Sequence, residues 1–277
     1  MERCAVKDNR CMTLETARAN RAAYDAQRVV RRYAAHSRLQ PPEQVVLDKL
    51  APRLAAMRML DIGVGAGRTT LHFAHRVKRY VGIDYAANMV RACEHRFPDA
   101  GPTISFMTCD ARRLEPFDDA AFDFVLFSFN GLDHIDHDGR IEALREINRV
   151  LAPGGVFLFS AHNLLSVPRL FASPWRDVRR RPWLLAPKLF RWLMLRRLNW
   201  PPRKLTHAAC ATINDGAHGF RLATHYIRPD EQLRQLTATG FGDISILTLD
   251  GREVPPNANL DQLDDFWLYY LCEKHGC

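Results

Sequence analysis

The chain has 277 residues, of which 47% are hydrophobic and 25% charged, the balance of a globular protein that can bury a core. Its 16 prolines and 15 glycines are scattered, which excludes a collagen-like or low-complexity protein. The net charge of +8 is local, because residues 164–205 alone carry eleven Lys or Arg against one acid.

The cysteine pattern and the chain start bear on the compartment. The seven cysteines are odd in number and include no CxxC pair, which argues against a zinc ribbon or a disulfide framework and favours a reducing compartment. The first 21 residues are polar and lack the apolar core of a signal peptide. No apolar run approaches the roughly 20 residues of a membrane-spanning helix. We therefore expect a cytoplasmic protein, and nothing in the sequence indicates its oligomeric state.

The first predicted element is a helical extension over residues 1–54. Residues 13–38 read as a polar-faced helix, the pair at 41–42 (Pro-Pro) breaks it, and residues 43–54 look like a second helix. The candidate inward positions of the first helix are Tyr24, Val29, Val30 and Tyr33.

Short apolar runs then alternate with amphipathic stretches. The predicted strands are 57–62, 80–83, 104–107, 122–129, 156–160, 244–249 and 266–272. The predicted helices are 69–77, 86–97, 138–151 and 229–239. Such alternation implies an α/β fold, with a parallel sheet covered by helices on both faces. The ending is compatible with a seven-stranded, mostly parallel sheet whose last strand runs antiparallel.

A glycine-rich turn follows the first predicted strand. In MLDIGVGAGRTT, residues 59–70, the glycines Gly63, Gly65 and Gly67 alternate just before a helix. Glycine lets the backbone bend sharply and lets a ligand approach without a Cβ in the way. Asp84 ends the next strand, where a carboxylate can accept both ribose hydroxyls of a nucleoside. A tight structural turn would explain the glycines alone, but their combination with Asp84 predicts a nucleoside site.

The spacing of these glycines separates two ligands. A dinucleotide fingerprint, GxGxxG, that starts at Gly63 requires glycine at a position that is Arg68 in this chain. The observed pattern is DxGxGxG. An NAD-dependent oxidoreductase is therefore disfavoured.

Five segments in order resemble the class I S-adenosylmethionine-dependent methyltransferases, a Rossmann-like superfamily. They are LDIGVGAG, GIDYAANMV, CDAR at 109–112, FDFVLFSFNGLDHI at 122–135 and EINRVLAPGGVFLFSAHN at 146–163. The resemblance covers roughly residues 24–163 and 229–272. It implies S-adenosylmethionine as the methyl donor and S-adenosylhomocysteine as the product, and it leaves the acceptor unnamed.

The resemblance also implies which residues hold the methionine part of the cofactor. The turn from Gly63 to Gly67 packs against it, and Asp61 orders this turn near the ammonium group. Ser128 supplies a carbonyl close to the same ammonium. Tyr24 and Tyr33 resemble an N-terminal pattern in which a phenol closes over the carboxylate. For the two tyrosines, core aromatic residues on an amphipathic helix remain an equal alternative.

A second group of residues matches the positions that hold the nucleoside. The resemblance implies that Asp84 binds the ribose and that Tyr85 and Met89 lie beside the adenine. Asp110 accepts from the adenine amino group, with the backbone of Ala111 alongside. A turn residue at a strand end is the alternative interpretation of Asp110.

A hydroxyl acceptor must lose its proton, normally to a group with a pKa near neutrality. Two histidines follow strand ends, where ligands of such sheets bind: His134 and His162. We prefer His134 as the base, with Asp133 or Asn130 as its orienting group or as a substrate contact. Loop histidines with structural hydrogen bonds are the alternative for both. Residues 133–137 also offer metal ligands on paper, but no matching ligands occur elsewhere, so we expect no metal.

The basic stretch interrupts the alternation. Residues 164–220 hold four of the five tryptophans, and we expect them to form a helical cap inserted into a methyltransferase domain of residues 55–163 and 221–277. This insertion can cover the acceptor site, lie on an anionic membrane through residues 164–205, hold RNA, or form solvated basic helices that pack their tryptophans on the domain.

The sequence thus predicts methyl transfer to an oxygen or nitrogen of a small-molecule acceptor. A membrane-associated lipid or quinone is the second acceptor class. A protein that binds S-adenosylmethionine or S-adenosylhomocysteine without turnover is the alternative outside catalysis. The chain shows no NPPY-like tetrad of amino-methylating DNA enzymes and no Pro-Cys nucleophile after the fourth strand, which disfavours cytosine C5 chemistry and a nucleic acid partner.

Overall fold

A computed structural model describes residues 20, 22, 24–173, 185–205, 207–217, 219–220 and 222–275. Most of the predicted first helix before Tyr24 lies outside the described residues, as do Trp175, Trp183 and the basic residues between them. Among the described residues, Cys93, Cys109, Cys210 and Cys272 form no disulfide bond.

The described strands form one mixed sheet. They are β1 (Arg58–Ile62), β2 (Arg79–Asp84), β3 (Ile104–Thr108), β4 (Phe122–Phe127), β5 (Leu151–Asn163), β6 (Cys210–Ile213), β7 (Thr224–Ile227), β8 (Phe241–Leu247) and β9 (Trp267–Lys274). Seven of them follow the order β3-β2-β1-β4-β5-β9-β8, in which the pairs are parallel except those of β9. The predicted seven-stranded, mostly parallel sheet with an antiparallel last strand is therefore confirmed.

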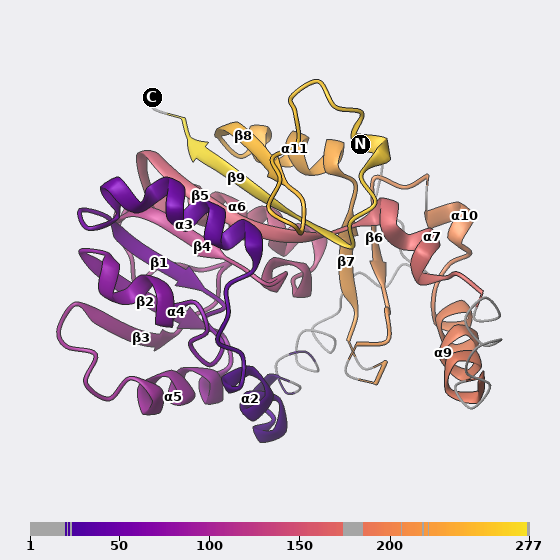
Figure 1. Ribbon diagram of the computed structural model, residues 1–277, viewed down its shortest axis with the longest axis horizontal. Helices are drawn as coiled ribbons and strands as arrows, with labels where there is room; N and C mark the ends of the chain where they lie inside the picture. The colour runs from indigo at the N-terminus through magenta and orange to yellow at the C-terminus, as the bar shows by residue number, and fades with distance from the viewer. Residues whose placement is uncertain are drawn as a thin grey trace.

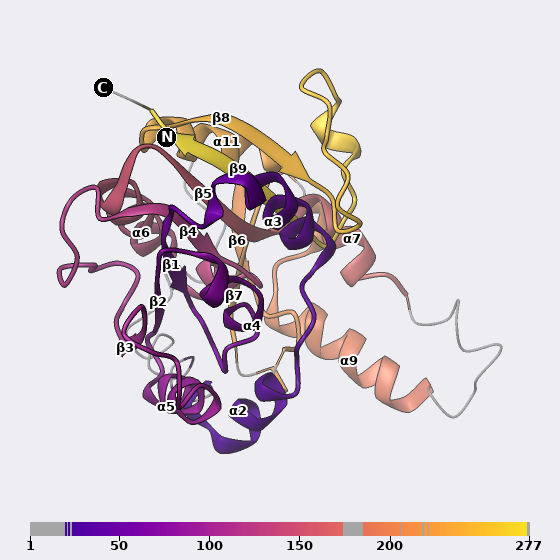
Figure 2. The same cartoon turned by 60° about the vertical axis from the view of Figure 1, so that its left-hand side comes forward.

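Helices cover both faces of this sheet (Figures 1 and 2). They include α3 (Pro41–Leu54), α4 (Thr70–Phe73), α5 (Ala87–Arg96), α6 (His137–Val150) and α11 (Pro229–Ala238). Because successive strand residues point to opposite faces, β4 serves two cores. Val125 and Phe127 pack with α6 and α11, while Phe124 and Leu126 pack with α3 and α4.

The N-terminal extension packs against the carboxyl edge of the domain. The helix α2 (Gln27–Ala34) lies beside α5, where Val29 packs with Met89 (Figure 1). The two prolines at 41–42 do not break the first helix, because α2 already ends at Ala34; they are the first two residues of α3, where proline already has the φ of a helix start. Glu43 completes a capping box with Gln40.

The region predicted as a helical cap is partly β-structure. Its described helices are α7 (Val167–Leu170), α9 (Leu185–Leu198) and α10 (Pro202–Leu205), and α9 projects away from the sheet (Figures 1 and 2). The unpredicted strand β6 pairs antiparallel with β7, which continues parallel to the end of β5. These strands have four residues each, too few to show a clear alternation.

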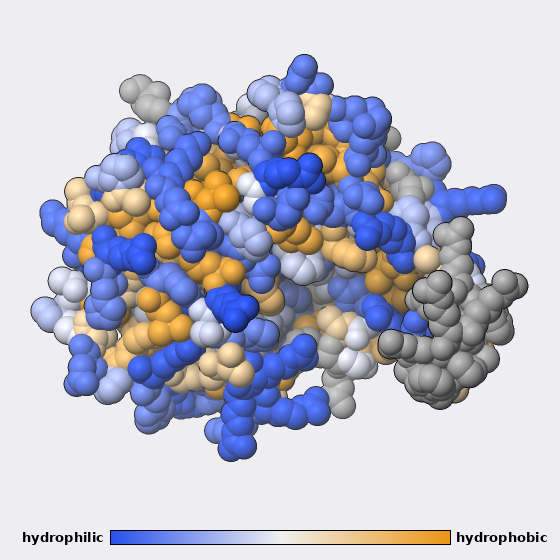
Figure 3. Space-filling view, in the orientation of Figure 1, coloured by the Kyte–Doolittle hydropathy of each residue, from blue (hydrophilic) through white to orange (hydrophobic). Residues whose placement is uncertain are grey.

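The surface and the described helices bear on membrane contact. In the orientation of Figure 1, apolar patches are separated by hydrophilic side chains (Figure 3). Within the described ranges, no helix combines the length and the apolar character needed to cross a bilayer.

Candidate active site

The glycine turn lies at the carboxyl end of β1, between β2 and β4. Gly63 has φ +65° and Gly67 has φ +78°, a region that side-chain-bearing residues rarely adopt. A Cβ on Gly67 would lie 2.5 Å from the ring of Phe97, and one on Gly63 would lie 3.1 Å from the ring of Phe127. Conformation and close packing therefore both require glycine at this turn.

A cavity of about 470 Å³ opens over this turn. It gathers ten of the twelve residues predicted to hold the cofactor: Tyr24, Tyr33, Gly63, Gly65, Asp84, Tyr85, Met89, Asp110, Ala111 and Ser128. His134 also lines the cavity. A smaller hollow of about 30 Å³ beside it is lined by Asp61 and Arg68, and shares Tyr33, Gly63, Gly65, Ser128 and Phe129 with the cavity. The expected cofactor residues thus converge on one space.

Asp84 is oriented by the backbone on either side of it. Its carboxylate accepts hydrogen bonds from the N–H of Gly65 (3.0 Å) and the N–H of Ala86 (2.8 Å), and the residue is 6% exposed. Burial raises the pKa of Asp84 to about 6, although these two donors lower it. One acceptor direction on each oxygen remains for a ligand hydroxyl.

Asp61 stabilises the glycine turn through hydrogen bonds to two hydroxyl groups. Its Oδ2 accepts from the hydroxyls of Thr69 and Tyr80, each at 2.5 Å, and burial raises the pKa of Asp61 to about 6. The carboxylate therefore ties the turn to β2, and it also lines the smaller hollow.

A buried ion pair, which the sequence did not reveal, borders the smaller hollow. Arg68 donates to Glu43 of α3 at 2.5 and 2.7 Å, and the Glu43 side chain is completely buried. The same carboxylate accepts from the hydroxyls of Ser128 and Tyr269. The guanidinium lies 5.2 Å from the ring centroid of Phe129. The residue that replaces the third fingerprint glycine thus joins the extension to the end of β4.

Asp110 also lines the cavity, and it forms an ion pair with Arg112. Arg112 donates to its two oxygens at 3.0 and 2.6 Å. Burial opposes ionisation, but Arg112 holds the pKa of Asp110 below its ordinary value. The sequence contained Arg112 in the CDAR segment, although it gave no sign that this side chain folds back on Asp110.

The aromatic wall of the cavity comes from the extension. Tyr24 and Tyr33 meet edge to face, with ring centroids 6.0 Å apart, and the Tyr24 hydroxyl lies 2.7 Å from Nε2 of His134. Burial raises the pKa of Tyr24 well above its ordinary value, so the phenol stays protonated at neutral pH. Asn20 also lines the cavity and donates to the carbonyl of His134 at 3.2 Å.

Of the two side chains offered as orienting groups for His134, Asp133 contacts His162 instead. Asp133 is fully buried, and its carboxylate accepts from Nδ1 of His162 at 2.8 Å and from Arg140 at 2.5 Å. Burial opposes ionisation, but Arg140 lowers the pKa of Asp133. The 3-10 turn η3 (Gly131–His134) points this carboxylate at the neighbouring end of β5. Adjacency in the sequence did not predict adjacency in space.

Asn130 and His162 stand just outside the cavity lining. The Asn130 amide nitrogen lies 3.5 Å from Nε2 of His162, and its backbone N–H donates to Ser160. Phe129 and Asn130 have φ values of 55° and 60°, a strained conformation for residues other than glycine. This strain turns the Phe129 ring toward Tyr33 and Arg68, at the mouth of the smaller hollow.

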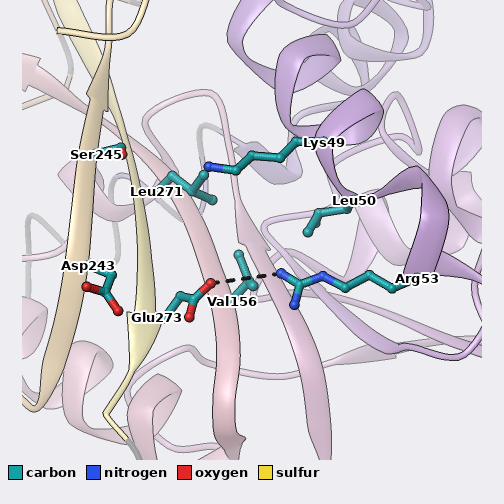
Figure 4. A pocket seen from close by; sticks show the side chains of 8 residues that line it. All are labelled: Lys49, Leu50, Arg53, Val156, Asp243, Ser245, Leu271 and Glu273. Atoms are coloured by element: carbon teal, nitrogen blue, oxygen red, sulfur yellow. Dashed lines mark ion pairs between the residues drawn. The ribbon is translucent and has the colours of Figure 1, made fainter. Parts of the chain in front are cut away.

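A third hollow, of about 310 Å³, lies between α3 and the β8–β9 edge (Figure 4). Lys49 and Arg53 extend into it from α3, and Arg53 pairs with Glu273 of β9 at 3.9 Å. Asp243 adds a second acid. With two cations and two acids the hollow has no charge preference, and none of the predicted site residues lines it.

Comparisons with known proteins agree with this geometry. Residues 59–155 match a family described as a methyltransferase domain. The chain is 35% identical over 131 residues to ubiquinone/menaquinone biosynthesis C-methyltransferase UbiE of Bordetella avium. The aligned segment covers 46% of this chain and 50% of that protein. It is 36% identical over 108 residues to demethylmenaquinone methyltransferase of Thermus thermophilus, and this alignment covers 38% of this chain and 47% of that protein. The chain thus spans about half the length of these relatives.

Solved structures extend the likeness to the fold. An S-adenosylmethionine-dependent methyltransferase from Mesorhizobium loti is similar with a TM-score of 0.58 and 18% identity, over 84% of this chain and 98% of that one. The 1,6-didemethyltoxoflavin-N1-methyltransferase of Burkholderia thailandensis was solved with 1,6-didemethyltoxoflavin and S-adenosylhomocysteine bound. It also has a TM-score of 0.58 and 18% identity, over 95% of this chain and 90% of that one.

The sheet order and the glycine turn define a Rossmann-like nucleoside-binding fold. Residues 59–155 match a methyltransferase domain, and in its fold the chain is similar to S-adenosylmethionine-dependent methyltransferases.

Proposed function

We propose that this chain transfers a methyl group from S-adenosylmethionine to an oxygen or nitrogen of a small-molecule acceptor. The observation that carries the proposal is the single cavity of about 470 Å³, which collects the glycine turn, Asp84, Asp110 and an aromatic wall in one space. A nucleoside donor and an acceptor placed above it would be shielded there by Tyr24 and Tyr33.

The chain would act mainly by alignment. Bound S-adenosylmethionine supplies an electrophilic methyl group, whose bond to sulfur breaks as the bond to the acceptor forms, and the sulfur keeps the electron pair. Asp84 holds the ribose and Asp110, shared with Arg112, faces the adenine in this proposal. The ordered turn over Asp61 fixes the methionine part, so the acceptor needs only to meet the methyl group in line.

The proton of a hydroxyl acceptor needs a base within hydrogen-bond reach. His134 lines the cavity, so we assign the role to it, with Tyr24 in place of Asp133 as the group that orients the ring. His162 has the carboxylate partner typical of a base, but it lies outside the cavity lining.

The test has two steps. Calorimetry should show binding of S-adenosylhomocysteine and none of NAD. Metabolite extracts incubated with methyl-labelled S-adenosylmethionine should then yield a labelled small molecule. Binding without labelling of any fraction would refute the enzyme and leave a binding protein.

Once an acceptor is known, His134→Gln should lower kcat by about 10²–10⁴-fold, the usual contribution of a general base. His162→Gln is the matched variant and should keep most of the turnover. The reverse result would move the base to His162.

A second acceptor class has an observation of its own. On α9, Phe190 and Leu193 are 60% and 52% exposed and lie one helical turn apart. This helix carries four cations and no acid, the composition of a helix that lies on an anionic membrane. The names of two relatives concern ubiquinone and menaquinone. A membrane-borne quinone or lipid, methylated at carbon, would fit these features.

Flotation with anionic liposomes tests this alternative. The wild-type chain should float, and a Phe190→Ser/Leu193→Ser variant should stay in solution. Leu71→Ser, which removes a 42% exposed leucine from α4, is the control and should float. Equal partition of all three proteins would end the membrane proposal.

A further inference from the structure

Three potential metal ligands meet where the β6–β7 hairpin touches α6. They are His137, Cys210 and His225, whose ligand atoms all lie within 4.8 Å of one another. The Cys210 sulfur is 3.7 Å from Nδ1 of His137, and the ring centroids of the two histidines are 5.9 Å apart. Cys210 is 2% exposed and His225 is fully buried. This cluster is distinct from the cofactor cavity, whose lining includes none of the three residues.

The fold brings the cluster together from three elements. In the hairpin, Cys210 stands opposite Ile227 and Thr212 stands opposite His225. Since alternate residues of a strand share a face, Cys210 and His225 project diagonally from the same face of the hairpin. His137 meets that face as the first residue of α6, directly after the cap residue Asp136.

The His225 imidazole is fully buried, and its polar neighbour is the Cys210 thiol. Neither ring nitrogen makes a hydrogen bond of ordinary geometry to the described residues, so the thiol contact satisfies the ring poorly. Poorly satisfied polar groups are rare in protein interiors, because a buried group that loses its partner costs about 1–3 kcal/mol. A metal ion is one partner that an imidazole nitrogen accepts in an interior site.

We propose that His137, Cys210 and His225 bind one Zn²⁺ ion, a site outside the methyl-transfer machinery. Zinc prefers this mixture of sulfur and imidazole ligands, at about 2.3 Å from sulfur and about 2.0–2.1 Å from nitrogen. Ligand atoms around a tetrahedral ion are then about 3.5 Å apart, close to the 3.7 Å between Cys210 and His137. The Cys210 thiol gives up its proton on binding, and a water completes the fourth position.

Charged side chains around the cluster are already paired with each other, so they do not oppose binding of a cation. Arg140, a buried cation whose charge acts on both histidines, is paired with Asp133 at 2.5 Å, and Glu231 on α11 is paired with Arg234 at 2.6 Å. The proposed ion would clip the hairpin of the insertion to the first turn of α6. It would therefore stabilise the part of the molecule that continues the sheet beside His162.

The experiment uses the full chain without a histidine tag, with Co²⁺ as a spectroscopic probe and Zn²⁺ as its competitor. The wild-type protein should bind one equivalent of Co²⁺ with a thiolate-to-cobalt charge-transfer band, which Zn²⁺ abolishes. Cys210→Ser should lose the band. His137→Ala should weaken binding by at least about 10–100-fold, since even partners of metal ligands contribute that much.

The matched control is Cys109→Ser, which removes a half-buried thiol far from the cluster in sequence and should bind as the wild type does. His137→Ala changes a partly exposed residue, so its fold is expected to survive. Circular dichroism checks this, and Zn²⁺ should raise the Tm of the wild type but not of this variant. A thiolate band that persists in Cys210→Ser, or no stoichiometric binding by the wild type, overturns the proposal. The readout is independent of methyl transfer.

Discussion

The carboxylate of Asp84 offers the sharpest test of the cofactor site. Each of its oxygens already accepts one backbone N–H, at 3.0 and 2.8 Å, so each has one further acceptor direction for a ribose hydroxyl. Hydrogen bonds to a charged group contribute about 1.5–3 kcal/mol. Asp84→Ala should therefore weaken binding of S-adenosylhomocysteine by about 1–3 kcal/mol, which is about 5- to 150-fold.

Isothermal calorimetry measures this change, with circular dichroism to confirm that the variant folds. The matched control is Asp119→Ala, whose carboxylate is 80% exposed and pairs with Arg149 away from the cavity; its affinity should equal that of the wild type. An Asp84→Ala variant that folds and binds with unchanged affinity would refute the ribose assignment.

Burial raises the pKa of Asp84 to about 6, and binding of the ribose needs the ionised carboxylate. The affinity for S-adenosylhomocysteine should therefore be constant above pH 7 and fall as the pH drops through 6. A calorimetric pH series checks this, and the fall should be smaller in Asp84→Asn. Asp133→Asn leaves a buried arginine without its carboxylate and should lower the free energy of unfolding by about 3–5 kcal/mol in urea, whereas Asp119→Asn at the surface should cost at most about 1 kcal/mol. Gly67→Ala should destabilise more than Gly154→Ala in the same assay, since both have φ near +70° to +80° but only Gly67 would place a Cβ against a ring; equal losses would contradict the packing argument.

Local signals account for what the sequence predicted well. The glycine turn and Asp84 are set by backbone conformation and by the end of a strand, and both are visible in a short window. The order of strands and helices followed from hydrophobic alternation, which is also local. Ten of the twelve residues that these features predicted to hold the cofactor line one cavity.

The remaining contacts depend on packing between distant segments. The pair of Glu43 with Arg68 joins α3 to the glycine turn, and the Asp133 carboxylate selects His162 over its neighbour His134. Neither choice changes the pattern of apolar residues. The strands β6 and β7 were not predicted for another reason, because strands of four residues are too short to give a periodic signal.

The ion pair of Glu43 with Arg68 also limits how far the chain can be truncated from its N-terminal side without a loss of stability. The matched family segment begins at residue 59, so a fragment cut there would seem complete, yet it would omit α3 and with it the only acid that the described structure pairs with Arg68. The arginine, 13% exposed with α3 in place, would lose its buried counter-ion, and the core residues of β1 and β4 that pack on α3 would lose their cover. Deletion libraries should thus show a sharp loss of yield once the cut passes Glu43. The physical boundary of this domain lies upstream of its recognisable one.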